Sequence, residues 1–305
     1  IVMPLYNKAE QVLDSLRSVQ AQTFADWELV VVDNASAVPV QLPDAWAGRG
    51  RVIREERLGL TQARLCGIRE ARGALLVWVD DDNVLELDYL EQAQSAFDAR
   101  PDLGAAGGRS LPEYEVPPPV WFRPDLAPLG CRDLGDETVL MSWQATRPDY
   151  PSAAPNGAGL VARKQAMQLW ADAVQHDARR MSLGRQGAKL TSGEDNDISM
   201  TILRAGWQLA YLPGLRLIHI IAAGRLQPDY LARIARVSFR DFICVLDIHG
   251  VRRWHAIPSW TIPLRALRAY FTFKAWQGPA AYIRWQSAVG QFEGRALLSK
   301  KTFIK

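Results

Sequence analysis

Three consecutive aspartates, Asp80, Asp81 and Asp82, offer the clearest chemistry in the 305-residue sequence. They follow directly on residues 75–79, an apolar run without a polar interruption. Adjacent carboxylates repel one another, and a fold holds them together cheaply only if a cation, hydrogen-bond donors or water offset the repulsion. Carboxylate oxygens favour Mg²⁺, Mn²⁺ and Ca²⁺. The trio therefore predicts a divalent-metal site, and the alternative is an Asp-rich N-terminus of a helix over residues 85–99.

The elements that would position these aspartates follow from the apolar pattern. Residues 75–79 are typical of a central parallel strand that is covered on both faces. A second apolar strand over residues 28–32 also stops at an acid, Asp33. Further elements are expected as a strand over residues 51–54 and helices over residues 8–20 and 60–71. This order predicts a mostly parallel sheet flanked by helices, whose ligands bind outside the carboxyl ends of the strands.

The second half of the chain adds two candidates for chemistry. Glu194 and Asp195 open a predicted helix over residues 193–205, where a carboxylate could act as a general base or simply charge the first turn. His219 lies near the end of an expected strand over residues 215–220, which would follow another strand over residues 207–212. A lone histidine in an apolar strand is either a core residue or a ligand.

Composition indicates a globular protein, with 48% hydrophobic and 23% charged residues, long enough for one large α/β domain plus an appendage. The three cysteines, Cys66, Cys131 and Cys244, have no metal-type spacing, which favours a reducing compartment over a disulfide framework. No stretch of about 18 residues is apolar and uncharged, so we expect no transmembrane helix.

Charge is distributed unevenly along the chain. Residues 251–305 hold ten Lys or Arg and one acid, Glu293, whereas residues 1–250 hold 26 bases and 32 acids. The basic segment also contains Trp254, Trp260, Trp276 and Trp285. Bases mixed with tryptophans predict peripheral contact with an anionic membrane, and the alternative is the core of a small helical subdomain.

A helix within this basic segment would present one apolar stripe. The stripe is expected to comprise Leu264, Leu267, Phe271 and Ala275, with Arg265, Arg268 and Thr272 on the neighbouring stripe. An interfacial helix requires such an arrangement.

Five short motifs occur in a defined order along the first two thirds of the chain. They are Pro4-Leu5-Tyr6-Asn7, Val31-Val32-Asp33-Asn34-Ala35-Ser36, Ala63-Arg64 before Gly67, Val79-Asp80-Asp81-Asp82, and Gly193-Glu194-Asp195. With these spacings the sequence resembles the family 2 glycosyltransferases, which have the GT-A fold, over roughly residues 1–220. The resemblance implies an inverting enzyme that transfers a sugar from a nucleotide-sugar, most often a UDP-sugar, with Mn²⁺ or Mg²⁺.

The same resemblance implies a role for each matching residue. Asp33 would read the nucleotide base, unless it is only a turn residue. Asp80 and Asp82 would form the ends of a DxD motif, with Asp82 and His219 binding the metal. Asp195 would be the general base, with Glu194 as the second choice. The remaining donor-binding candidates are Pro4, Tyr6, Asn7, Ser36, Arg64 and Asp81, and the alternative for Arg64 is a helix-surface charge.

The predicted organisation is a GT-A domain over residues 1–225 and a helical, basic C-terminal extension over residues 226–305. The donor half of the domain would span about residues 1–110, and the acceptor half about residues 111–225. The acceptor would be a glycan or a lipid-linked glycan in cell-surface polysaccharide biosynthesis, and no nucleic-acid partner is expected. We expect a cytoplasmic protein at the inner face of the membrane. The alternatives are a sugar nucleotidyltransferase and a non-catalytic module that binds nucleotides or glycans.

Overall fold

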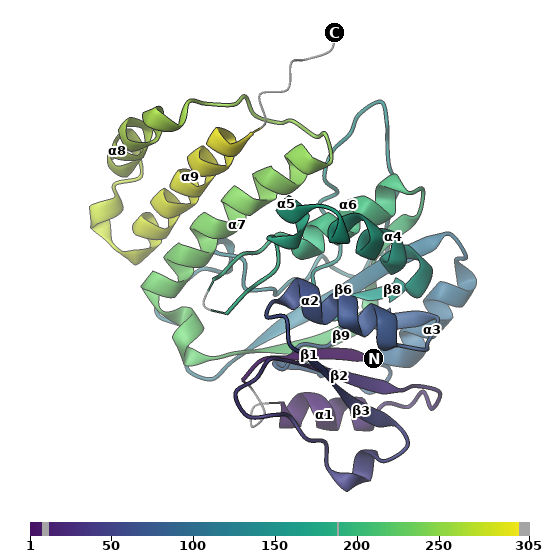
Figure 1. The fold of residues 1–305 in the computed structure, drawn as a ribbon. Helices are drawn as coiled ribbons and strands as arrows, with labels where there is room; N and C mark the ends of the chain where they lie inside the picture. Colours follow the sequence, from purple (N-terminus) through teal and green to yellow (C-terminus); the bar gives the residue numbers. More distant parts are fainter. Residues whose placement is uncertain (8–11, 188, 299–305) are drawn as a thin grey trace. The chain divides into compact units, whose positions relative to one another are not determined.

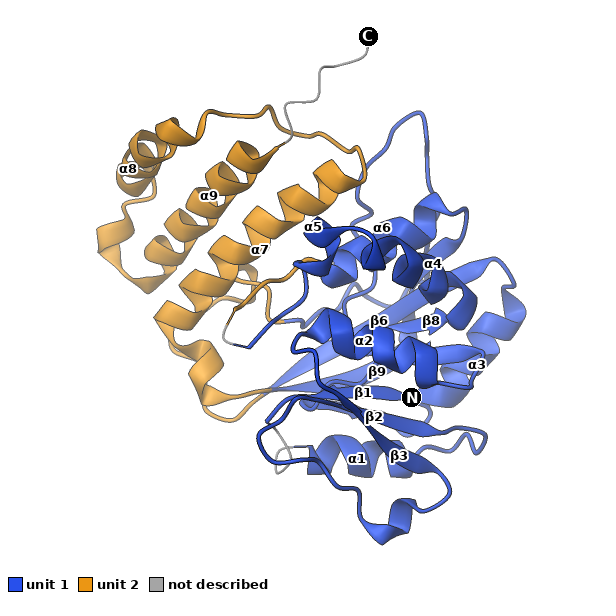
Figure 2. Ribbon diagram, in the orientation of Figure 1, with its two compact units in different colours: residues 1–113, 130–188, 194–220 blue, residues 114–129, 189–193, 221–305 orange. Residues whose placement is uncertain are grey.

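The computed structural model describes residues 1–7, 12–187 and 189–298 (Figure 1). The chain forms two compact units, coloured separately in Figure 2. Unit 1 comprises residues 1–113, 130–188 and 194–220, and unit 2 comprises residues 114–129, 189–193 and 221–305. Residues 8–11 of the predicted helix over residues 8–20 lie outside the described part of the chain.

Unit 1 contains a three-stranded parallel sheet of order β1-β2-β3. Its elements are β1 (Val2–Leu5), α1 (Leu13–Gln20), β2 (Leu29–Asn34), β3 (Gly50–Glu55) and α2 (Leu60–Glu70). Alternate residues of β2 face opposite sides, as the period of two requires. Leu29 and Val31 pack in one hydrophobic cluster with α1, whereas Val30 and Val32 pack in another with α2. The two helices therefore cover opposite faces of the sheet.

A second sheet in unit 1 has the order β4-β8-β6-β9-β5, with β7 paired to β9. Its strands are β4 (Leu75–Val77), β5 (Asn83–Leu85), β6 (Leu103–Tyr114), β7 (Val139–Met141), β8 (Val161–Arg163) and β9 (Gln208–Ile221). The pairs β4-β8, β6-β8, β5-β9 and β7-β9 are antiparallel. The predicted parallel pairing thus describes the first sheet and not these pairs. An apolar run indicates that a strand is buried on both faces. It does not indicate whether the neighbouring strands are parallel or antiparallel to it.

The apolar run before the aspartates lies where the two sheets meet. Trp78 forms an isolated parallel bridge with Val2 of β1, and its backbone N–H donates to the carbonyl of Leu160 (2.8 Å). The N–H of Val79 donates to the carbonyl of Val2 (3.1 Å). Because this segment is hydrogen-bonded on both sides and Trp78 is fully buried, the position at which Asp80 begins is fixed.

The remaining helices of unit 1 are α3 (Tyr89–Ala99), α4 (Lys164–Gln175), α5 (Ala178–Met181) and α6 (Glu194–Arg204). Two sequence-based boundaries were wrong. The helix expected over residues 85–99 begins at Tyr89, because residues 83–85 form β5 against β9. The two strands expected over residues 207–212 and 215–220 are one strand, β9, which continues through Pro213 and Gly214.

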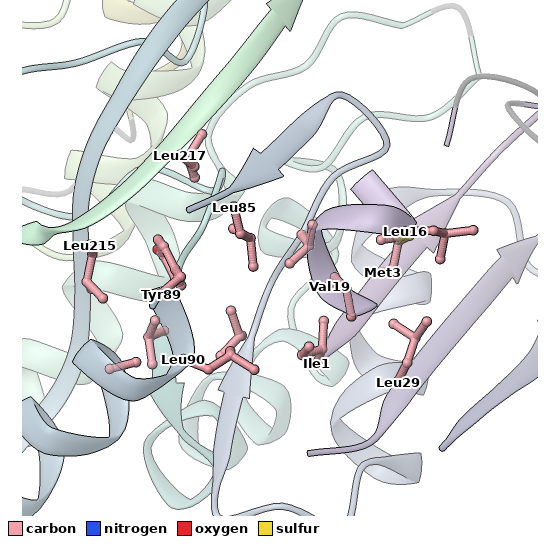
Figure 3. Close-up of a cluster of buried hydrophobic side chains, with 14 of the residues drawn as sticks. Ile1, Met3, Leu16, Val19, Leu29, Leu85, Tyr89, Leu90, Leu215 and Leu217 are labelled. Carbon is pink, nitrogen blue, oxygen red and sulfur yellow. The ribbon is translucent and has the colours of Figure 1, made fainter. Parts of the chain in front are cut away.

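A buried hydrophobic cluster connects the elements of unit 1 (Figure 3). It joins side chains of β1, β2 and α1 with side chains of β5, α3 and β9. The residues labelled in Figure 3 are Ile1, Met3, Leu16, Val19, Leu29, Leu85, Tyr89, Leu90, Leu215 and Leu217. Leu85 and Leu217 are also paired in the β5-β9 register. The cluster therefore anchors the strand that follows the aspartate trio.

Unit 2 is mainly helical, as predicted for the C-terminal region. Its helices are α7 (Pro228–Ile248), α8 (Ile262–Thr272) and α9 (Pro279–Leu297). Gly290 and Gly294 of α9 lie against α7: a Cβ atom at Gly290 would come within 1.9 Å of the Arg236 carbonyl oxygen. The absence of side chains at these positions lets the two helices pack closely. In the described part of the chain, no helix has both the length and the apolarity needed to cross a membrane.

Candidate active site

The aspartate trio lies in a tight turn between β4 and β5. The N–H of Asn83 donates to the carbonyl of Asp80 (3.1 Å), and the Asn83 side-chain oxygen accepts from the N–H of Asp80 (3.2 Å). The Asn83 amide group also donates to Asp82 Oδ1 (3.0 Å). Asn83 is fully buried, so it fixes the turn from inside. The alternative of an Asp-rich helix N-terminus is excluded, since α3 begins only at Tyr89.

His219 reaches the trio through the register of β5 and β9. It pairs with Asn83 across these strands, and the N–H of Ile220 donates to the carbonyl of Asp82 (2.8 Å). His219 Nε2 lies 3.3 Å from Asp82 Oδ1. The histidine is 4% exposed, so it is a core residue that also contacts the carboxylate. The two predicted metal ligands, 137 positions apart in sequence, are adjacent in space.

The electrostatics of Asp80 differ from those of an ordinary surface aspartate. Burial raises its pKa, and the neighbouring charge of Asp82 raises it further. The nearby Arg64, His219 and Arg185 oppose this increase without reversing it. Burial and the neighbouring carboxylate therefore both disfavour the charged form of Asp80.

Asp82 and His219 supply one carboxylate oxygen and one imidazole nitrogen, a donor pair suited to Mn²⁺ and acceptable to Mg²⁺. Within residues 1–7, 12–187 and 189–298, no group of three or more His, Cys, Asp or Glu side chains is arranged to hold a metal. Asp82 and His219 therefore form a partial set of ligands. Mg²⁺ typically completes such a set with phosphate oxygens and water.

Arg64 and Glu194 form a buried ion pair that joins α2 to α6. Arg64 Nε lies 3.2 Å from Glu194 Oε1, and the two side chains are 3% and 4% exposed. Thr61 donates its hydroxyl to Glu194 Oε2 (2.9 Å), and the Arg64 guanidinium stacks over the ring of Trp78 (5.3 Å to the centroid). Burial raises the pKa of Glu194, and Arg64 opposes the increase. The interpretation of Arg64 as a helix-surface charge was therefore wrong.

The first turn of α6 carries three acids, of which two are enclosed. Glu194 is paired as described, and Asp197 accepts from the indole N–H of Trp170 (2.9 Å) at 1% exposure. Asp195 is partly exposed. Its carboxylate accepts from the backbone N–H groups of Gly157 (3.2 Å) and Asn196 (2.9 Å). Of the two predicted base candidates, Asp195 is the partly exposed one and Glu194 is buried.

The carboxylate of Asp33 is held by the chain itself. It accepts from the N–H groups of Ser36 (3.2 Å) and Val40 (3.4 Å) and from Arg54 Nη1 (2.7 Å). Asp33 is 1% exposed. Burial alone would raise its pKa, but the hydrogen bonds from Ser36 and Arg54 hold the pKa below its ordinary value. The structure thus gives Asp33 the turn-residue role, and its contact with a nucleotide base stays a prediction.

The motif Pro4-Leu5-Tyr6-Asn7, at the end of β1, is hydrogen-bonded to the turn that follows Asp33. The N–H of Asn7 donates to the Ser36 hydroxyl (3.0 Å), and the N–H of Ala37 donates to Asn7 Oδ1 (2.9 Å). Asn7 has a positive φ of 53°, which Asn tolerates better than most residues. Pro4 lies within β1, and Tyr6 is 40% exposed. Asn7, Asp33 and Ser36 therefore belong to one hydrogen-bonded loop pair.

Sequence reasoning missed several residues of this region. Arg54 neutralises Asp33, and Arg185 is close enough to oppose the raised pKa of Asp80. The backbone carbonyl of Arg185 accepts from the N–H of Leu60 (2.8 Å), which ties its loop to the start of α2. Asn83 directly follows the trio, so an Asx turn could have been expected there. Nothing in the sequence spacing indicated Arg54.

Comparison with known proteins identifies the N-terminal part of the chain. The sequence profile of glycosyl transferase family 2 matches residues 1–136. The match covers the first 136 of the 305 residues. The family 2 segment includes Asp33, Arg64 and the aspartate trio, whereas Asp195 and His219 lie beyond it.

Two relatives illustrate the range of similarity. Glycosyltransferase AglE of Haloferax volcanii is 31% identical over 104 residues, which cover 32% of this chain and 34% of that protein. An N-acetylglucosaminyltransferase of a Rhizobium species is 25% identical over 264 residues, 81% of this chain and 54% of that protein. The chain spans about half of the rhizobial relative and about a third of the archaeal one.

Solved structures share the fold of this chain. Residues 1–349 of S. aureus TarS in complex with UDP superpose with a TM-score of 0.54 at 13% identity, covering 96% of this chain and 89% of that one. The complex of the same protein with UDP-GlcNAc gives a TM-score of 0.53. This similarity confirms the predicted α/β fold of the GT-A type.

Proposed function

We propose that this protein is an inverting, metal-dependent glycosyltransferase that uses a nucleotide-sugar donor. One observation carries the proposal: the β5-β9 register brings His219 to Asp82 at the end of the aspartate turn, within a family 2 fold. A structural core needs no such concentration of carboxylates beside a histidine. A diphosphate bound through a divalent cation does.

The donor we propose is a UDP-sugar. The rhizobial relative is named an N-acetylglucosaminyltransferase, and TarS structures contain UDP and UDP-GlcNAc. UDP-N-acetylglucosamine is therefore the first donor to test. Asp33, Ser36, Asn7, Tyr6 and Pro4 would bind the nucleoside, and Arg64, Asp80 and Asp81 would border the diphosphate.

Asp82 and His219, with Asp80 beside them, would hold Mn²⁺ or Mg²⁺. When bound, the cation would act as a Lewis acid toward the diphosphate leaving group. The chain itself contributes the ion pair of Arg64 and Glu194, which fixes the guanidinium beside Asp80 and Trp78. We assign Glu194 to this positioning role.

Asp195 would be the general base. In an inverting transfer the acceptor oxygen attacks the anomeric carbon, the bond from that carbon to the diphosphate oxygen breaks, and the acceptor proton passes to a carboxylate. Asp195 is the partly exposed acid of the first turn of α6, and backbone donors hold both of its oxygens. Such a base typically contributes about 10²–10⁴-fold in rate.

The acceptor we propose is a glycan or a lipid-linked glycan of cell-surface polysaccharide biosynthesis. The protein would act in the cytoplasm, with peripheral contact between residues 251–305 and the inner face of the membrane. The excess of bases in this segment supports that placement.

A donor screen tests the function directly. UDP-, GDP- and dTDP-sugars would be compared by thermal shift with and without Mn²⁺, followed by a transfer assay with glycan and lipid-linked acceptors. We expect a Mn²⁺-dependent shift with a UDP-sugar. Binding without transfer to any acceptor would favour the non-catalytic module, and exchange of the nucleotide with pyrophosphate would favour a nucleotidyltransferase.

The two acids that open α6 provide the sharpest test of the mechanism. Asp195→Asn keeps the shape but cannot take the proton, so donor affinity should survive while turnover falls by about 10²-fold or more. Glu194→Gln leaves the buried Arg64 charge unpaired. Its main effect should be to lower the free energy of unfolding, by about 3–5 kcal/mol. An Asp195→Asn variant with normal turnover would place the base elsewhere.

A further inference from the structure

We propose that one face of α8 is a docking surface for an anionic lipid bilayer. The α8 face is defined here as Trp260, Leu264, Leu267 and Phe271, which are 73%, 65%, 57% and 60% exposed. Trp260 belongs to the short 3₁₀ turn that leads into α8. The spacings of four, three and four residues place the side chains on one stripe of the helix. Unit 2 thus presents four large apolar side chains to its surroundings.

The small side chains of α8 point the other way. Ala269, on the side opposite the α8 face, is 7% exposed, and the Ala266 carbonyl accepts from the indole N–H of Trp285 in α9 (2.9 Å). A helix that only filled the core of a subdomain would turn its large apolar residues inward. In α8 the alanines face α9 and the large residues face away, so the apolar stripe is not used in folding unit 2.

A cluster of aromatic rings packs next to the α8 face. The ring of Tyr270 contacts the rings of Phe271, Trp276 and Trp285 at centroid distances of 5.7, 5.7 and 5.3 Å. Trp276 is itself 55% exposed. Ala275 does not extend the stripe as predicted: it lies beyond the end of α8 and is 5% exposed. Tryptophan and tyrosine are enriched where proteins meet the polar-apolar boundary of a bilayer.

Basic residues border the α8 face. Arg268 and Lys274 are exposed, and Arg265 is half-buried. In the described part of the chain, none of these three forms an ion pair with an acid. The single acid of residues 251–305, Glu293, pairs with Arg236 of α7. Burial lowers the pKa of Arg295, and the neighbouring positive charge of Arg265 lowers it further.

The apolar α8 face and its basic border together indicate which kind of surface binds there. A second copy of the chain, docked symmetrically on its own α8 face, would bring like-charged borders together. An anionic bilayer instead offers a negative surface to the bases and an apolar interior to the tryptophan, leucine and phenylalanine side chains. The inference deepens the proposed membrane contact and rests on that part of the proposed function. Binding to vesicles requires neither donor nor metal, so its failure would leave the glycosyl transfer untouched.

Co-sedimentation with vesicles tests the proposal. The whole chain would be mixed with vesicles of phosphatidylcholine, or of phosphatidylcholine with phosphatidylglycerol, without nucleotide or divalent metal. We expect binding to the anionic vesicles, weak binding to the neutral ones, and release by high salt. Equal affinity for both kinds of vesicle, or no binding to anionic vesicles at low salt, would overturn the proposal.

Two pairs of variants separate the apolar and the charged contributions. Leu264→Gln with Leu267→Gln should weaken anionic-vesicle binding by about 10-fold or more, since both side chains would lose their burial in the acyl boundary. Leu169→Gln, at an exposed position of α4, is the matched control. Arg268→Glu with Lys274→Glu should weaken binding by at least about 10-fold, because each base near an anionic surface contributes about fivefold.

The charge control is Arg72→Glu with Arg147→Glu, which changes the net charge equally at exposed positions of unit 1. All substituted positions are exposed, so the thermal midpoints should stay near that of the parent chain. If Arg72→Glu with Arg147→Glu weakens binding as much as Arg268→Glu with Lys274→Glu, net charge alone drives the contact and the α8 face is not the docking surface. If the α8 variants instead dissolve a dimer and leave vesicle binding unchanged, the face is an oligomer contact.

Discussion

Two acids that close apolar strands in unit 1 have opposite electrostatic environments. Asp33 follows the apolar stretch of β2, and Asp80 follows the apolar run that begins at β4. At Asp33, Arg54 and two backbone N–H groups bind the carboxylate, and its pKa is lowered. At Asp80, burial and the neighbouring Asp82 raise the pKa. The first carboxylate is satisfied by the chain, and the second retains unfavourable charge.

This difference separates a structural role from a binding role. At Asp33 the guanidinium of Arg54 already neutralises the carboxylate, so a cation would gain little there. At Asp80, burial and a second carboxylate disfavour the charged form, and a bound cation would offset that cost. The aspartate trio with His219 is therefore the better candidate for the metal, whereas the carboxylate of Asp33 stabilises its own loop.

The largest effect should come from removing the carboxylate of Asp82, the proposed metal ligand that lies 3.3 Å from His219. We expect Asp82→Ala to lower transfer by about 10³-fold or more, because a metal on a transferring group supplies several kcal/mol of charge stabilisation. It should also abolish the Mn²⁺-dependent part of donor binding, measured by calorimetry. Asp98→Ala, at an exposed position of α3, is the control. Full activity of the parent protein in EDTA would contradict this role for Asp82.

A smaller effect is expected at His219, which contacts Asp82 from β9. His219→Ala should weaken Mn²⁺ binding by about 10-fold, since water can take a vacated position in the coordination of a hard cation. His176→Ala removes an exposed histidine after α4 and should leave Mn²⁺ affinity unchanged. If both variants bind Mn²⁺ with the same affinity, His219 is not a metal ligand and serves only in the packing of the core.

Much of this arrangement could be predicted from the sequence. The apolar strands, the acids that close them and the basic C-terminal segment follow from local pattern, and the resemblance of five motifs indicated the GT-A fold. The location of His219 beside Asp82 was expected only from that resemblance. Its cause, the pairing of β5 with β9, is a long-range contact that no local pattern encodes. A three-residue strand such as β5 is also too short to show a period.

Burial of polar groups was harder to predict than their chemistry. Arg64 and Glu194 are 130 positions apart, and each would be a plausible surface charge by itself. Their pairing depends on how α2 and α6 pack, so it emerges only in the folded chain. For the same reason Arg54, the last residue but one of β3, gave no sign that it would neutralise Asp33.

At Asp33 we predict a loss of stability with a defined pH range. Asp33→Asn removes a charged acceptor of three hydrogen bonds and should lower the free energy of unfolding by about 1–3 kcal/mol at neutral pH. A depressed pKa in the folded state means that the carboxylate stabilises the fold above the unfolded-state pKa of about 3.9. The difference from the parent chain should therefore persist down to about pH 4 and shrink as the pH falls through the lower, folded-state pKa.

Urea denaturation at several pH values measures this effect. Asp26→Asn, at an exposed position of unit 1, is the matched control and should change stability by less than about 0.5 kcal/mol. If Asp33→Asn leaves stability unchanged and weakens only the binding of uridine nucleotides, the carboxylate acts on the base and its contacts with Ser36, Val40 and Arg54 contribute little.

The smallest effect should have the opposite sign. Without metal, Asp80→Asn relieves the repulsion from Asp82 and removes a charge that burial disfavours, so the free energy of unfolding should rise by about 0.2–1 kcal/mol. With Mn²⁺ and a UDP-sugar the order should reverse, because a ligand that binds only the folded state stabilises it in proportion to its affinity. Thermal midpoints of both proteins, with and without these ligands, give the four values needed. A variant that is less stable than the parent chain in EDTA would show that the Asp80 carboxylate is satisfied by the chain, as that of Asp33 is, and the contrast between the two strand ends would fail.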